Sequence, residues 1–431
     1  MRFLPKVPGD AFTFIVLFLA TGAFQSMLLD NSSPQAVAAG NPLLQIAWIA
    51  VYVLMFVRAL QHRRILLEII RANKLLFAVA FFALLSTLWS SDPGVTLRRG
   101  VAVVATTVFG ADLAARFSLR DQLKILAFVL GVVVVLSVFV QVLFPGLVPT
   151  ADSAYGSAWN GAFIQKNDFA RIVVLATIVW VLLIPRGPQK SLTTTIVVGG
   201  ACALVLATQS KTGLVVLVAM LGWMRLLRFF QKRSTAWMAA GVLGLLIVAG
   251  IVSVSFDMDH ATQMLGRDST LTGRTQIWEL SLQSAWHRPI LGYGYSAFWN
   301  VSPEALHIRR LLHWDVPHAH NGFIELILEL GFVGLGLMIC LYLMALVRGV
   351  RYLKRNWSQE SAWPLLYVVL TLMYQITENT IFVANTIFWM LLVAAICSIT
   401  EIAPARSRKR VGETAYASAA MPRITFGEEY L

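Results

Sequence analysis

The sequence predicts an all-α, polytopic integral membrane protein with about twelve transmembrane helices and both termini in the cytoplasm. Hydrophobic residues make up 58% of the 431-residue chain and charged residues 13%, about half the usual share. The mean hydropathy is +0.70, and a soluble core does not absorb that much apolar surface. Apolar runs of about 17–25 residues, each long enough to cross a bilayer as a helix, recur along the chain.

These runs predict the helices in chain order. They cover residues 11–29, 43–60, 75–90, 96–114, 123–143, 168–185, 192–208, 212–229, 236–255, 322–347, 362–378 and 381–402. Residues 1–403 then form one transmembrane domain. Residues 404–431 form a tail that is first basic and then rich in Ala and Ser, and we expect this tail to be disordered in the cytoplasm.

The positive charges predict the orientation. A net charge of +13 would suggest a nucleic-acid partner in a soluble protein. Here most lysines and arginines fall in every second connection between apolar runs, as the positive-inside rule requires of cytoplasmic connections. The excess charge therefore reflects topology, and we expect no nucleic acid as a partner. All 3 cysteines lie within predicted spans, which excludes a disulfide framework.

Two segments on the outer side are longer than the other connections. One covers residues 144–167, and the other, 256–321, is the long extracytoplasmic loop. Within the long loop, residues 273–288 place polar side chains three or four positions apart on one side and Trp278 and Trp286 on the other. This pattern predicts an amphipathic helix suited to the membrane interface.

The end of the long loop carries the most informative motif, His318-Ala-His320-Asn321-Gly322. Near neutral pH, histidine is the side chain best suited to take a proton from a hydroxyl. We favour His320 as the base, because it borders the helix that begins at 322 and so has rigid support. His313 and Asp315 add residue types found at zinc sites, but we expect no metal and no other cofactor.

Two cations are candidates for binding a phosphate. Lys211 lies in the short hairpin between two predicted spans, and Arg274 immediately precedes the amphipathic helix. A lysine at the mouth of a bundle either snorkels to water or meets an anion. In the second case, ammonium and guanidinium groups neutralise charge on a departing phosphate.

Several other residues have two interpretations. Glu325 and Glu329, one turn apart near the hydrocarbon, orient His320, pair with an outer arginine, or form interhelical hydrogen bonds. Glu378, in the last outer hairpin, is a candidate for the same cavity. The rings of Tyr293, Tyr295 and Trp299 either stack on sugars or belong to an interfacial aromatic belt. We expect the glycines at 331, 334 and 336 to let helices approach closely.

Together these motifs resemble the O-antigen ligase and polymerase superfamily of bacterial envelope glycosyltransferases. The resemblance rests on His320-Asn321, nine residues, then Gly331-x-x-Gly334, and on Gly273-Arg274-Thr275-x-x-Trp278 and Arg288-Pro289-x-Leu-Gly292-Tyr-Gly294. The segments around Lys166-Asn167 and Glu378-Asn379 are similar to the branch that polymerises exopolysaccharides of the succinoglycan and xanthan type. Ligases of the family carry Arg where this chain has Lys211, a change that keeps the charge and loses the bidentate fork.

The resemblance implies that an undecaprenyl-diphosphate-linked oligosaccharide is the donor. Repeat units would be polymerised into exopolysaccharide or O-antigen at the outer (periplasmic) face of the bacterial plasma membrane, with inversion and without metal. It implies catalytic roles for His320, Arg274 and Lys211. The implied substrate contacts are Lys166, Asn167, Arg288, Tyr293, Tyr295, Trp299, His318, Asn321, Glu325 and Glu378.

The implied partners are membrane lipid, a glycan or lipid A-core acceptor, and a chain-length regulator and a flippase of the same pathway. Two alternatives remain. One is an O-antigen ligase that transfers the glycan to lipid A-core, and the other is a lipid-linked oligosaccharide transporter or flippase. A transporter is expected to show internal repeats, broken helices and charges near the middle of the membrane. Here the unusual polar groups gather at one face.

Overall fold

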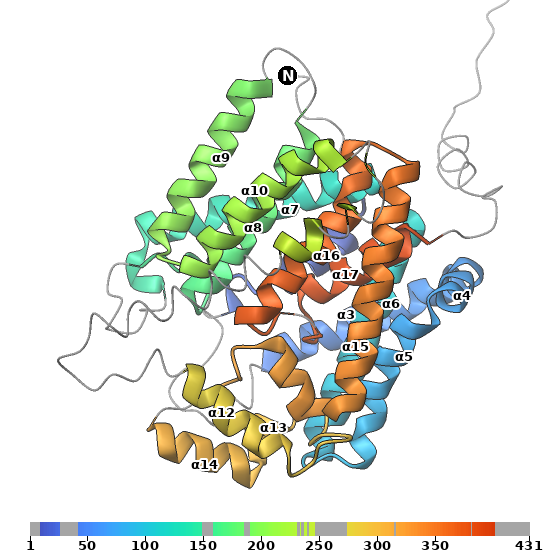
Figure 1. Ribbon diagram of the computed structural model, residues 1–431, viewed down its shortest axis with the longest axis vertical. Coiled ribbons are helices and arrows are strands. Elements are labelled where there is room, and N and C mark those ends of the chain that lie inside the picture. Colours follow the sequence, from blue (N-terminus) through green and yellow to red (C-terminus); the bar gives the residue numbers. More distant parts are fainter. Residues whose placement is uncertain are drawn as a thin grey trace, which may run out of the picture.

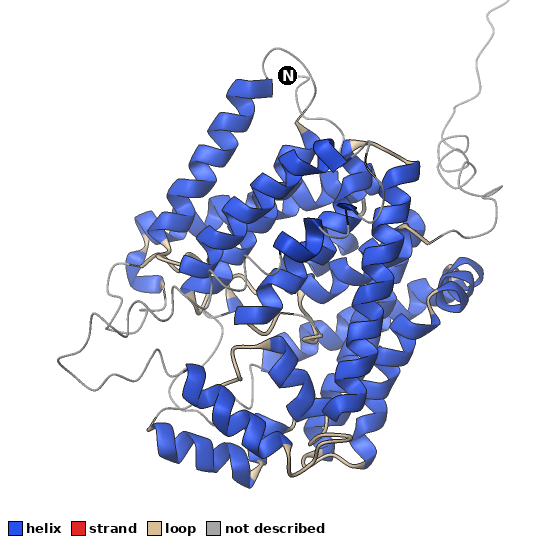
Figure 2. Cartoon of the chain, in the orientation of Figure 1, coloured by secondary structure: helices blue, strands red, loops and turns tan. Residues whose placement is uncertain are grey.

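The computed structural model describes residues 9–25, 42–148, 158–184, 190–230, 233, 237–238, 241–245, 274–313, 316–380 and 382–400. Helices dominate these residues, and none of the described residues forms a strand (Figure 2). The all-α class predicted from the sequence is confirmed for this part of the chain. The tail 404–431, the loop residues 256–273 and most of the predicted span 236–255 lie outside the described residues.

The main helices follow one another along the chain and are labelled in Figure 1. They are α1 (Ala11–Ala20), α3 (Pro42–Gln61), α4 (Arg63–Ala72), α5 (Lys74–Leu85), α6 (Pro93–Arg116), α7 (Leu119–Leu143), α8 (Lys166–Leu183), α9 (Lys190–Ala207), α10 (Lys211–Phe230), α12 (Arg274–Ala285), α13 (Phe298–Val301), α14 (Pro303–Leu312), α15 (Gly322–Arg355), α16 (Gln359–Thr377) and α17 (Ile387–Ser398).

Most of these helices fall on the predicted apolar runs. Helix α12 belongs to the long loop, and α4, α13 and α14 are helices that were not predicted. Residues 63–72 were predicted to belong to a connection and instead form α4, a short amphipathic helix. By length and composition, 3 described helices can each cross a membrane, namely Pro42–Gln61, Leu119–Leu143 and Gly322–Arg355. Several further helices are apolar and shorter. The structure is therefore that of a helical membrane protein, and the number twelve and the topology stay predictions.

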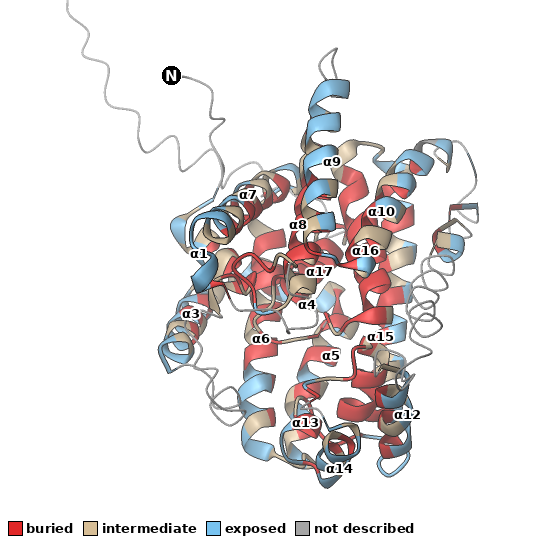
Figure 3. Cartoon of the chain, turned by 90° about the vertical axis from the view of Figure 1, so that its left-hand side faces the viewer, coloured by how far each residue is buried: buried red, intermediate tan, exposed pale blue. Residues whose placement is uncertain are grey.

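The core lies where α6, α16 and α17 meet. Helix α6 packs against α5 and α17, and α16 packs against α15 and α17. Figure 3 shows α16 and α17 largely buried and α6 buried mainly over its second half, whereas α9 is exposed along most of its length. Helix α3 is also exposed, with only 17% of its apolar window buried inside the protein. Because its exposed residues are apolar, this surface is suited to lipid rather than water.

Helix α15 is broken at Gly331, where the backbone has φ +64. The segment 289–294 fills the break. The backbone N–H groups of Tyr293 and Gly294 donate to the carbonyl oxygens of Leu328 and Glu329, at 2.8 and 2.9 Å. The N–H groups of residues 332 and 333 donate in turn to the carbonyls of residues 289 and 290. Backbone groups released by the break therefore find partners, as a non-aqueous environment requires.

This arrangement corrects the packing role expected of the glycines. A Cβ on Gly331 would lie 2.2 Å from the carbonyl oxygen of Ile290, so the close neighbour is a loop rather than another helix. A Cβ on Gly334 would meet Leu330 of the same helix, and one on Gly336 would meet nothing within 4 Å. Gly331 is required by its positive φ and by the crossing backbone.

Helices α12, α13 and α14 gather at one end of the bundle, beside the first part of α15 (Figure 1). The amphipathic helix predicted over 273–288 corresponds to α12. Its Ile277 is buried and packs in a small second core with Phe298 and Leu328. The first residues of α8, α10 and α15 and the last residue of α16 belong to the side that the predicted topology places outside. These helix ends form the candidate site.

Candidate active site

The segment that carries the histidines is held by hydrogen bonds on both sides. The indole N–H of Trp278 donates to the carbonyl of Ala319 at 2.9 Å. The N–H of Ala319 donates to the carboxylate of Glu325 at 2.8 Å. Asn321 caps α15, because its side-chain oxygen accepts from the N–H groups of residues 323 and 324. The backbone on each side of His320 is therefore fixed before any substrate binds.

His320 has a left-handed backbone conformation, with φ +51, which is uncommon for a side chain of this size. The turn directs its imidazole toward α16. Its Nδ1 lies 3.7 Å from an oxygen of Glu378. The backbone N–H of His320 donates to Nδ1 of His318 at 3.1 Å, which places the proton of neutral His318 on Nε2.

Glu378 is the centre of the site. It follows the last residue of α16 and its side chain is almost fully buried. One carboxylate oxygen accepts from the amide of Asn167 at 2.9 Å and from the guanidinium of Arg274 at 3.3 Å. Arg274 also donates to the carbonyl of Thr377 at 3.1 Å. A single carboxylate therefore ties α8 and α12 to the segment that begins after α16.

A second set of hydrogen bonds connects the segments that carry Lys166 and Lys211 to Glu378. The hydroxyl of Ser210 donates to the side-chain oxygen of Asn167 at 2.8 Å and accepts from the backbone of Gly213 at 3.1 Å. Lys211, the first residue of α10, follows directly and is exposed. Partial burial and the neighbouring charge of Lys211 lower the pKa of the Lys166 ammonium. Lys166 and Lys211 are thus the chain neighbours of Asn167 and Ser210, the two side chains whose hydrogen bonds lead to Glu378.

The charges fix the protonation states of two groups. Burial alone would raise the pKa of Glu378, but the neighbouring His320 and the charges of Arg171 and Arg274 lower the pKa of this carboxyl to about 2. Burial, together with the charge of His320, lowers the pKa of His318 to about 3. At neutral pH the site therefore holds an ionised glutamate and a neutral His318.

Arg171 belongs to the site although it was absent from the predicted site residues. It is one turn after Asn167 on α8, is ion-paired with Asp168, and its charge acts on Glu378. Its guanidinium also lies over the ring of Phe388 at 5.6 Å from the centroid. The four-residue spacing from Asn167 near the start of a predicted span was the available signal.

Four residues that were predicted to contact the substrate lie outside the cluster around Glu378. Tyr293, Tyr295 and Trp299 are buried, with 1%, 1% and 6% of their surfaces exposed. The hydroxyl of Tyr293 donates to the carbonyl of residue 284, and that of Tyr295 to the carbonyl of residue 382. Their rings have no open face for a sugar, so the proposed sugar stacking is wrong. Arg288 donates to Ser91 and stacks on Tyr293, away from Glu378.

Three side chains of the site are of types that also bind metals. One ligand atom each from His318, His320 and Glu378 lie within 4.8 Å of one another. The surrounding charge is unfavourable for a divalent cation, because Glu378 already bonds to Arg274 and Arg171 lies nearby. The same charge is favourable for an anion.

Taken together, the fold and this cluster define a membrane protein with a buried histidine–glutamate pair beside several cations, a combination suited to a substrate that carries phosphate. Residues 194–339 match the protein-family model described as O-antigen ligase. Over this region the chain is similar to the O-antigen ligase and polymerase superfamily. The match includes Lys211, Arg274 and His320, and it excludes Glu378 and Asn167.

A curated relative is the exopolysaccharide production protein ExoQ of Rhizobium meliloti (strain 1021), which is 27% identical over 299 residues. The alignment covers 66% of this chain and 66% of the relative, just under two thirds of its length. The family model and the relative both have names that belong to polysaccharide synthesis, O-antigen ligase and exopolysaccharide production protein.

Proposed function

We propose that the protein is a glycosyltransferase that polymerises undecaprenyl-diphosphate-linked oligosaccharide repeat units at the outer face of the bacterial plasma membrane. The observation that carries this proposal is the convergence of Arg274, His320 and the Lys211 hairpin on Glu378. These groups come from segments far apart in the sequence. They supply a base and an anion site, the two parts that transfer from a diphosphate needs.

The reaction can be written with these groups. The oxygen of an acceptor hydroxyl forms a bond to the anomeric carbon while the bond from that carbon to the diphosphate oxygen breaks. The bonding electrons leave with the diphosphate, whose charge is neutralised by Lys211, Arg274 and Lys166. The hydroxyl proton passes to His320. Attack from the face opposite the leaving group inverts the anomeric configuration.

Glu378 favours His320 over His318 as the base. Its carboxylate faces Nδ1 of His320, so it orients the ring, stabilises the imidazolium that forms, and leaves Nε2 for the proton, as the acid of a hydrolase triad does. His318 is less suited, because its Nδ1 already accepts a hydrogen bond and its pKa is lowered to about 3. Glu325 acts as a positioning residue through Ala319.

We propose that no metal takes part. In this mechanism Glu378 stays bonded to Arg274 and Asn167, and the arginines do the electrostatic work that a divalent cation would otherwise do. Addition of a chelator to the purified protein should leave the transfer rate unchanged. A loss that added Mg²⁺ or Zn²⁺ restores would assign His318, His320 and Glu378 to a metal instead.

Two observations favour polymerisation over ligation to lipid A-core. The first is Lys211 in the place where the family's ligases carry arginine, and the second is the similarity to a protein named for exopolysaccharide production. We propose a flippase and a chain-length regulator of the same pathway as partners. The flippase would deliver the repeat units to the outer leaflet.

The deciding experiment uses the purified full-length protein in lipid bilayers with lipid-linked repeat units as the substrate. Chain length should grow with time, and His320→Ala should stop the growth while the protein still folds. His318→Ala should retain measurable growth. If only one transfer occurs, to added lipid A-core, the protein is a ligase. If wild type and His320→Ala are equally active, the proposed base is wrong.

A further inference from the structure

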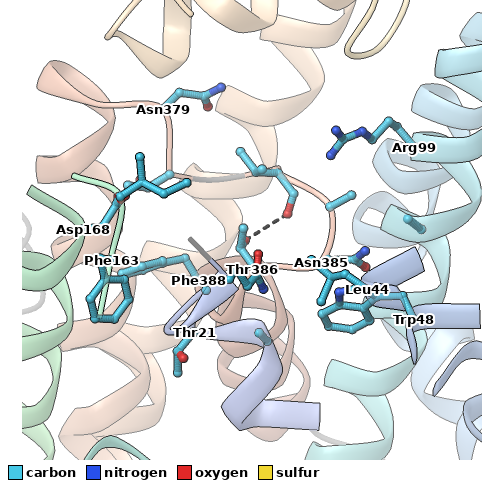
Figure 4. Close-up of a pocket in the computed structure, with 18 of the residues that line it drawn as sticks. Thr21, Leu44, Trp48, Arg99, Phe163, Asp168, Asn379, Asn385, Thr386 and Phe388 are labelled. Carbon is cyan, nitrogen blue, oxygen red and sulfur yellow. Dashed lines mark hydrogen bonds between the residues drawn. The ribbon is translucent and has the colours of Figure 1, made fainter. Parts of the chain in front are cut away.

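A cavity of about 540 Å³ lies beside the Glu378 cluster (Figure 4). Its walls come from the ends of α1, α3, α6 and α8 that the predicted topology places outside, and from residues 379–388. Glu378 faces the histidines, whereas the next residues, Asn379 and Thr380, line the cavity. Arg171 links the two places, because it lines the cavity and its charge acts on Glu378.

The cavity has an excess of positive charge. Arg98, Arg99 and Arg171 line it together with a single acid, Asp168, which is ion-paired with Arg171. None of the salt bridges between described residues includes Arg98 or Arg99. The charge of Arg99 also acts on Glu329, which is buried in α15. Figure 4 shows Arg99 on one wall and Asp168 on the opposite wall.

One wall of the cavity is apolar and faces the predicted lipid. It consists of Leu44, Trp48 and Ile49 of α3. Ile49 is 59% exposed on the surface that we assign to lipid contact. The opposite lining is polar and includes Asn379, Asn385 and Thr386. A cationic, amide-lined cavity with an apolar wall open to lipid fits a phosphorylated lipid headgroup and the first part of its chain.

None of the described residues that line the cavity is a histidine. The cavity therefore has cations for a phosphate and lacks the base found in the neighbouring cluster. This is the combination expected where a diphosphate is bound and kept rather than cleaved. Its volume falls within the range of about 300–1,000 Å³ that is usual for ligand pockets.

We propose that this cavity is a second lipid-diphosphate site, which holds the acceptor substrate while the Lys211–Arg274 site holds the donor. The inference rests on the proposed polymerase function, because only polymerisation uses two lipid-linked diphosphates in one transfer. Arg98 and Arg99 bind the acceptor diphosphate, and the acceptor glycan reaches His320 past Asn379.

The test counts bound lipid. The full-length protein is placed in phosphatidylcholine nanodiscs, undecaprenyl diphosphate is added, and the bound molecules are counted by native mass spectrometry. Wild type should bind two molecules. Arg98→Gln with Arg99→Gln should bind one, as should Lys211→Gln with Arg274→Gln. The apparent Kd of the lost site should rise at least about tenfold, since guanidinium–phosphate bonds are strong.

Two controls keep the result interpretable. Arg310→Gln removes an exposed cation of α14 outside both sites and should leave two molecules bound. Arg98→Lys with Arg99→Lys retains the charge and should keep the second molecule, which excludes misfolding as the cause. One molecule on wild type, or two on the Arg98→Gln, Arg99→Gln protein, overturns the proposal. Equal displacement by phosphatidylglycerol also overturns it, because the cavity would then accept any anionic lipid.

The outcome can be separated from failure of the proposed function. His320→Ala should abolish transfer and still bind two molecules. Arg98→Gln with Arg99→Gln should slow transfer to a lipid-linked acceptor at least about tenfold, with little effect on transfer to a lipid-free repeat unit at high concentration. If wild type transfers no glycan and still binds two lipids, the polymerase assignment fails while the second site stands.

Discussion

Glu378→Gln is the sharpest test of the site, because the substitution keeps the size of the side chain and removes its charge. The carboxylate is 2% exposed, and Arg274, its ion-pair partner, is 17% exposed. Removing one partner of a buried ion pair costs about 3–5 kcal/mol, because the other charge stays buried and uncompensated. Arg171 loses the same nearby charge. We expect a loss of stability in this range.

The transfer rate should fall further than stability alone explains. Without the carboxylate, His320 loses the group that orients it and stabilises its protonated form, so we expect a fall of at least about a hundredfold. The affinity for diphosphate should change in the opposite direction. Because the cluster gains net positive charge, undecaprenyl diphosphate should raise the unfolding temperature of Glu378→Gln more than that of wild type.

Glu360→Gln is the matched control. Glu360 also pairs with an arginine, Arg120, at 3.7 Å, but that pair is exposed, with 68% of the arginine side chain accessible. Exposed pairs contribute about 0–1 kcal/mol, so this variant should resemble wild type in every measurement. Unfolding temperature, transfer rate and the shift caused by diphosphate are measured on both proteins in the same bilayers. If Glu378→Gln behaves like Glu360→Gln, the central place given to Glu378 is refuted.

Three further variants test other parts of the structure. Gly331→Ala should cost about 2 kcal/mol or more of stability, because Gly331 has a positive φ and the added Cβ would meet the Ile290 carbonyl. Gly336→Ala is the control. Its Cβ meets open space, so this variant should be neutral or slightly stabilised in thermal unfolding. Trp278→Phe leaves the Ala319 carbonyl without its donor, so kcat should fall while diphosphate affinity is kept; equal losses in both would contradict a positioning role. Burial lowers the pKa of His318 to about 3, from 6.5 for an exposed histidine, so its contribution to stability is complete well above pH 6.5 and is lost as the pH falls below that value. His318→Gln should therefore remove about 2 kcal/mol of the stability difference between pH 6.5 and 5, and the exposed His307→Gln should not, as followed by unfolding temperature.

Much of the fold follows from the sequence, because a span needs only an apolar run of sufficient length. The helix starts at Lys211 and Gly322 agree with the predicted runs to within one residue. The break at Gly331 could not be placed, since the backbone that fills it lies about forty residues earlier in the chain. The extra helix α4 was missed for another reason. Its apolar residues are interrupted by arginines, and the charge pattern indicated only a cytoplasmic connection.

The candidate site, like the fold, could be predicted only in part. His320, Arg274 and Lys211 could be named as candidates from the sequence, because a histidine or a cation beside a bilayer needs an explanation. The contacts of Glu378 could not be predicted, because its three partners come from segments far apart in the sequence, namely α8, α12 and the turn before α15. The prediction that aromatic rings stack on sugars failed for a physical reason. Tyrosine and tryptophan have the same composition signal whether their rings face a sugar or, as with Tyr295, their hydroxyls bind buried carbonyls.

The motif at 288–294 and the motif at 320–334 are separate in the sequence but are joined by backbone hydrogen bonds in the structure. The break at Gly331 lets residues 322–330 take a direction of their own, and residues 289–294 lock that direction through backbone bonds. Residues 322–330 begin at the cap formed by Asn321, which also donates to the carbonyl of residue 376 at 3.1 Å. The position of His320 relative to Glu378 is therefore set by contacts at both ends of the segment 322–330, at Asn321 and at Gly331. Because backbone atoms make these bonds, only glycine at 331 preserves them, which gives both motifs a geometric role in placing His320.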